Sequence, residues 1–161
     1  MGFLPAAALL VMVAVVQSGQ DGNAPPVLSS ALRSHLRTET LSPIATVAAL
    51  PVPVRNALQD LFKDKTLILA DPGAPFQATD VVMGTPLPWR RMIAAGCSQD
   101  HCVVYYERGG IAHVYTIVVF KLDGAKARFE FGGAAPGGLT GIDAVKTALA
   151  SGSVLGYSSY F

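Results

Sequence analysis

The chain has 161 residues, with 12 basic and 11 acidic side chains, a formal charge of +1 and 51% hydrophobic residues. This near balance of charge leaves no electrostatic footprint for nucleic-acid binding, and the hydrophobic content excludes a disordered chain. The length fits a single domain of ordinary size.

The N-terminal segment has the pattern of a secretory signal peptide. Residues 1–20 carry no charged side chain, and the apolar run at residues 3–16 is shorter than the roughly 20 residues of a membrane span. Although no Lys or Arg precedes this run, the pattern predicts cleavage after Ser18. We therefore expect a secretory signal peptide at residues 1–18 and a secreted or periplasmic protein. An uncleaved membrane anchor is the alternative.

The mature chain is expected to begin with a flexible lead-in at residues 19–31, followed by one domain at residues 32–161. Ser42 and Pro43 have the residue types of an N-cap and a first helical position, which predicts a short helix at residues 43–50. A second helix is predicted at residues 54–63, where apolar residues recur at i, i+4, i+7 and i+8. Because this predicted helix has one apolar face, we expect it to pack on a sheet.

A β-meander of short strands is expected at residues 89–131, after a first strand at residues 66–70. The dipeptides Gly109-Gly110 and Asp123-Gly124 are favoured in two-residue hairpin turns and divide the meander. A last helix is predicted at residues 141–151. The sequence thus predicts an α+β fold with an antiparallel four- to five-stranded β-meander, packed on one face by two or three helices.

The only two cysteines, Cys97 and Cys102, enclose the first turn of the meander. Neighbours across a hairpin fall near the Cα separation of about 4.4–6.8 Å that a disulfide requires, and an exported chain favours this bond. Free thiols are one alternative. Another is a metal site of Cys97, His101 and Cys102, with His113 as a distant fourth ligand. Structural zinc sites usually bring a second well-spaced ligand pair. Here that pair is missing, so we expect a disulfide, no metal and no cofactor.

The turn lengths predict a register, and the register assigns side chains to the two faces of the sheet. A two-residue turn at Gly109-Gly110 places Tyr106 opposite His113. One face then collects apolar side chains, among them Tyr105 and Phe120, while the other mixes aromatic, ionisable and aliphatic groups. The mixed face is the predicted binding surface, and its members are Tyr106, His113, Tyr115, Arg128 and Glu130. A purely structural role of such cross-strand neighbours is the alternative.

No catalytic motif is present, since the sequence contains neither Gly-x-Ser-x-Gly nor His-Glu-x-x-His. His35 is expected in solvent, and Glu107 is expected to project away from His113. We therefore expect a small non-enzymatic binding module, whose partner is another exported protein or an envelope component. One alternative is a small hydrolase or ligand-binding enzyme that uses His113 with neighbouring tyrosines. The other is an envelope structural protein held by an uncleaved N-terminal helix.

Overall fold

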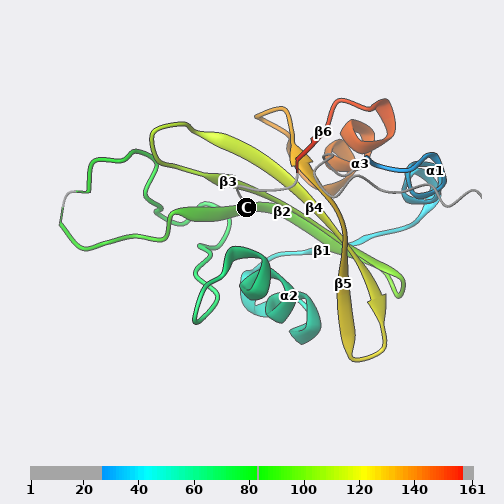
Figure 1. Cartoon of the computed structure of the whole chain (residues 1–161), viewed down its shortest axis with the longest axis horizontal. Helices are drawn as coiled ribbons and strands as arrows, with labels where there is room; N and C mark the ends of the chain where they lie inside the picture. Colours follow the sequence, from blue (N-terminus) through cyan, green and yellow to red (C-terminus); the bar gives the residue numbers. More distant parts are fainter. Residues whose placement is uncertain (1–26, 83, 158–161) are drawn as a thin grey trace, which may run out of the picture.

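The computed structural model describes residues 27–82 and 84–157 and has an α+β fold (Figure 1). Within these ranges six strands form one antiparallel sheet, in which each strand pairs with the next along the chain. The strands are Ser42–Ile44 (β1), Arg90–Cys97 (β2), His101–Arg108 (β3), Val114–Asp123 (β4), Lys126–Ala134 (β5) and Leu155–Gly156 (β6). The predicted fold class is confirmed, although the sheet has more strands than the four or five expected.

The two edge strands account for the difference in strand number. The helix predicted at residues 43–50 is wrong, because Ser42–Ile44 instead forms β1 and pairs with β2. Only a short 3-10 helix, Val47–Ala49 (η1), follows it, and Thr46 caps this helix by accepting a hydrogen bond from the backbone of Ala49 at 3.2 Å. The strand predicted at residues 66–70 is also wrong, since within it only Ala70 forms a bridge to the sheet.

The three α-helices of the described residues lie on both faces of the sheet. Val52–Phe62 (α2) packs below the sheet in Figure 1, whereas Ser30–Thr38 (α1) and Ile142–Ser151 (α3) lie above it. The expectation that the helices share one face is therefore wrong. The central strands are apolar on both faces, so each face needs a covering layer. None of the helices in the described part of the chain combines the length and apolar character of a membrane span.

Each layer of helices encloses its own hydrophobic core. The core under α2 contains, among others, Leu50, Val54, Leu58, Phe62, Met92, Val104, Tyr106, Val118 and Phe120. The core under α1 and α3 contains, among others, Leu28, Leu36, Val103, Tyr105, Ile117, Val119, Phe131, Val145 and Leu149. Leu28 belongs to the lead-in predicted at residues 19–31. The predicted signal peptide, residues 1–18, lies outside the described residues.

The register between β3 and β4 differs from the predicted one by three residues. Tyr106 pairs with Thr116 rather than with His113, and Arg108 pairs with Val114. The connection is longer than two residues because Gly109 packs against another loop. The backbone N–H of Gly109 donates to the Trp89 carbonyl at 3.0 Å. A Cβ atom on residue 109 would come 2.0 Å from the Gln77 carbonyl oxygen. A shift by an odd number of residues exchanges the two faces of a strand.

Tyr105 provides a test of the packing under α1 and α3. Its hydroxyl donates to the Pro136 carbonyl at 2.8 Å, and burial raises its pKa from 10.0 to about 12. Because the folded state holds this proton more strongly than the unfolded state, the resulting stability is complete below pH 10 and is lost as the pH rises towards about 12. Urea unfolding measured across this interval should show the loss, and Tyr105→Phe should reduce it. An unchanged pH profile in Tyr105→Phe would contradict this origin.

Candidate functional site

The disulfide-closed turn between β2 and β3 is the first part of the site. Cys97 and Cys102 are bonded, with their sulfur atoms 2.02 Å apart, and they pair directly across the two strands. The predicted disulfide is confirmed, so neither cysteine offers a thiolate to a metal ion. The Ser98 hydroxyl accepts the backbone N–H groups of Asp100 and His101, both at 2.9 Å. These internal hydrogen bonds order the backbone of the turn, while the side chains of Gln99 and Asp100 are exposed.

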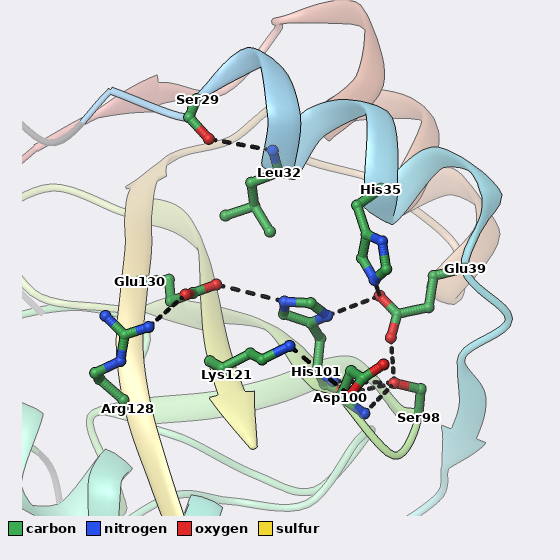
Figure 2. Close-up of polar contacts among 10 residues, drawn as sticks. All are labelled: Ser29, Leu32, His35, Glu39, Ser98, Asp100, His101, Lys121, Arg128 and Glu130. Carbon is green, nitrogen blue, oxygen red and sulfur yellow. Dashed lines mark hydrogen bonds and ion pairs between the residues drawn. The ribbon is translucent and has the colours of Figure 1, made fainter. Parts of the chain in front are cut away.

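A cluster of two histidines and two glutamates lies beside this turn, and we call His35, Glu39, His101 and Glu130 the histidine–carboxylate cluster (Figure 2). His101, at the start of β3, is only 4% exposed and lies between two carboxylates. Its Nδ1 is 2.9 Å from Glu39 Oε2, and its Nε2 is 3.4 Å from Glu130 Oε2. His35 Nε2 is 3.4 Å from the same Glu39 oxygen. Two imidazoles thus converge on one carboxylate.

Helix α1 positions the first two members of the cluster. Ser29 begins the helix by accepting a hydrogen bond from the Leu32 backbone at 3.1 Å, and Glu39 ends it. His35 and Glu39 are four residues apart, which places them on one face of the helix. The Lys146 ammonium of α3 donates to the backbone carbonyl of Glu39, and the Ser98 hydroxyl donates to its Oε1. The α3 lysine therefore holds the backbone of Glu39, and the serine of the β2–β3 turn holds its carboxylate.

The cluster borders a groove of about 750 Å³ between α1 and the sheet. Its lining includes Ser29, Leu32, His35, His101, Lys121, Arg128 and Glu130. The two cations of this lining are paired with carboxylates, since Lys121 is 3.7 Å from Asp100 and Arg128 is 2.9 Å from Glu130. Such a lining offers imidazole and carboxylate ligands for a metal ion and polar contacts for a bound partner.

The structure does not bring the five residues of the predicted binding surface together. Arg128 and Glu130 lie in the groove, whereas His113 and Tyr115 stack on each other elsewhere, with their ring centroids 4.9 Å apart. Tyr106 is fully buried under α2. The three-residue shift between β3 and β4 explains the position of Tyr106, because it turns this side chain to the face opposite to the expected one.

His113 belongs to a second polar cluster, around Glu107. Contrary to expectation, the two side chains point toward each other, and His113 Nε2 is 2.7 Å from Glu107 Oε2. The other carboxylate oxygen accepts a hydrogen bond from Arg91 Nε at 2.7 Å, and Arg91 Nη2 forms an ion pair with it at 2.6 Å. Both oxygens of Glu107 are thus occupied by side chains of the fold, and the buried Tyr106 does not take part in this cluster.

The sequence reasoning missed His35 and Glu39. The spacing His-x-x-x-Glu on a helix was an available signal, because it places both side chains on one helical face. Nothing local connects these residues to His101 and Glu130, which the sheet brings from two other strands. No family model, no curated protein and no solved structure matches this chain.

Proposed function

We propose that this chain is an exported, non-enzymatic binding module that recognises another exported protein or an envelope component through the disulfide-closed turn between β2 and β3. The observation that carries the proposal is the pre-organisation of this turn. A disulfide closes it, Ser98 holds its backbone, and Leu122 of β4 donates to the Asp100 carbonyl at 2.7 Å. A loop that is already ordered loses little conformational entropy when it binds.

The exposed side chains of the turn favour a partner with a complementary surface. Gln99 and Asp100 project from the end of the sheet beside the groove, and 61% of the Asp100 side chain is exposed. An ordered turn with exposed polar side chains fits a complementary surface on a partner, and the charge of Asp100 contributes to the specificity of the contact.

The disulfide also supports the proposal that the protein is exported. Disulfides form and persist in oxidising compartments and are rare in the cytosol. Together with the N-terminal apolar segment, the bond between Cys97 and Cys102 favours a secreted or periplasmic protein.

Charge reversal at the tip tests the proposal. With the tagged full chain as bait on an envelope extract, Asp100→Arg is expected to weaken binding of the captured partner at least about tenfold, or roughly 1.4 kcal/mol. The backbone hydrogen bonds of the turn do not use this side chain, so the fold should be retained. Asp123→Arg is the matched control, because Asp123 is an exposed acidic residue at the end of another strand.

The readout is quantitative capture by the wild type and both variants, with intact-mass analysis of each bait to report cleavage and the disulfide. Equal capture by Asp100→Arg and the wild type would overturn the assignment of the turn as the binding element. Loss of capture in both variants would indicate attraction by general charge instead.

A further inference from the structure

We infer that His35, Glu39 and His101 form a binding site for one divalent transition-metal ion, with Zn²⁺ the expected occupant. Each residue offers one ligand atom, and the three atoms lie within 4.8 Å of one another. Two imidazole nitrogens and one carboxylate oxygen suit zinc and its neighbours in the transition series, whereas calcium and magnesium prefer oxygen ligands. This inference goes beyond the proposed partner binding, because Gln99 and Asp100 do not belong to the ligand set.

The distances in the cluster are close to those of a metal site. Zinc bonds of about 2.0–2.2 Å in a tetrahedron place neighbouring ligand atoms roughly 3.3–3.6 Å apart. Glu39 Oε2 is 3.4 Å from His35 Nε2 and 2.9 Å from His101 Nδ1. A bound ion would replace the hydrogen bond between Glu39 and His101, and their 2.9 Å separation would lengthen toward the tetrahedral value.

The groups around the ligands are those that support a metal site. A metal-bound histidine generally donates its second ring N–H to a carboxylate or carbonyl, and a bound carboxylate is itself hydrogen-bonded. His101 has its Nε2 3.4 Å from Glu130 Oε2, on the side of the ring away from Glu39. Glu39 accepts a hydrogen bond from Ser98 through the oxygen that faces away from the histidines. Both buried ligands are therefore oriented by a second layer of residues.

The burial of the three ligands provides both rigidity and access. The side chains of Glu39 and His101 are 8% and 4% exposed, whereas that of His35 is 49% exposed. His35 and His101 both line the groove, which gives an ion a path to the site and leaves room for water at a fourth position. The two cations that line the groove, Lys121 and Arg128, are paired with carboxylates, which reduces their repulsion of a metal ion.

Calorimetric titration of the metal-free protein with Zn²⁺ tests the inference. We expect one Zn²⁺ per wild-type chain, no comparable binding of Ca²⁺ or Mg²⁺, and at least about tenfold weaker zinc binding in His35→Ala. His35 is half exposed, so this variant should fold. His113→Ala is the matched control, because it removes a histidine outside the cluster and should leave zinc affinity unchanged.

A second variant keeps all three ligands and changes only the layer around them. Glu130→Gln should weaken zinc binding about 10- to 100-fold, and the visible spectrum of the Co²⁺-loaded wild type should report a tetrahedral nitrogen and oxygen site. The inference is overturned if the wild type does not bind Zn²⁺ saturably, if His35→Ala binds as the wild type does, or if His113→Ala loses as much affinity as His35→Ala.

The metal site and the partner site can fail separately. Asp100→Arg is expected to lose the partner and to keep saturable Zn²⁺ binding, weakened less than in His35→Ala, because its side chain is not a ligand and its loss only frees Lys121 from an ion pair. Retained zinc binding without any captured partner would overturn only the proposed function. Partner capture by a chain that does not bind zinc would overturn only the metal site.

Discussion

Tyr106→Ala is expected to lower the free energy of unfolding by about 3–5 kcal/mol, the range observed when a buried large aromatic side chain is truncated. Tyr106 is fully buried under α2, and its ring meets that of Phe62 edge-on, with the centroids 5.2 Å apart. The truncation would open a cavity between the helix and the sheet. Urea unfolding at neutral pH, followed by circular dichroism, measures the change. A loss below about 1 kcal/mol would contradict this packing.

Tyr106→Phe distinguishes the contribution of the ring to stability from that of the hydroxyl. The buried hydroxyl lies beside Thr116 but makes no hydrogen bond of ordinary geometry within the described residues, and burial raises the pKa of Tyr106 far above its ordinary value, so the group stays neutral. Its removal is expected to change the free energy of unfolding by less than about 1 kcal/mol. A loss as large as that of Tyr106→Ala would show that the hydroxyl, and not the ring, stabilises this core.

The elements that depend on local pattern could be predicted from the sequence. The helix expected at residues 54–63 corresponds to Val52–Phe62, and the helix expected at residues 141–151 corresponds to Ile142–Ser151. Periodicity of 3.6 residues and a glycine after the last turn are local signals, and tertiary packing strengthens them. The disulfide was predictable for the same reason, since its two cysteines are separated by one short turn.

The register of β3 and β4 could not be predicted, because its cause lies elsewhere in the chain. Gly109 packs against the backbone at Gln77, and this contact displaces the turn that Gly109-Gly110 would otherwise form. The continuous apolar run at residues 103–106 was a signal that this strand is buried on both faces. The prediction instead assumed that one face of the strand is apolar and the other is mixed. The histidine–carboxylate cluster depends on the same long-range arrangement, since three separate elements contribute its members.

Glu107→Ala is expected to destabilise the fold by about 3 kcal/mol, near the lower end of the range for breaking a buried ion pair. The Glu107 side chain is 6% exposed and is held by Arg91 and His113, which are themselves partly exposed. The substitution would leave the Arg91 guanidinium without its carboxylate, and solvent at the partly exposed partners would limit the loss. Chemical unfolding of the variant and the wild type measures the difference.

The effect should extend to the loops that Glu107 connects to the sheet. Arg91 also donates to the Ala74 carbonyl at 3.0 Å and lies over the Phe76 ring, while His113 belongs to the connection between β3 and β4. Amide hydrogen exchange in both loops is therefore expected to accelerate in Glu107→Ala.

Arg128→Ala is the matched control for the loss of an ion pair. Arg128 pairs with Glu130, but its side chain is 74% exposed, so this variant should lose no more than about 1 kcal/mol. Equal losses in the two variants would contradict the role of burial. If amide exchange accelerates in both loops of Glu107→Ala and the variant still captures the partner, the role of Glu107 is to stabilise the fold. Loss of partner capture with normal stability would instead make the Glu107 cluster part of the binding site.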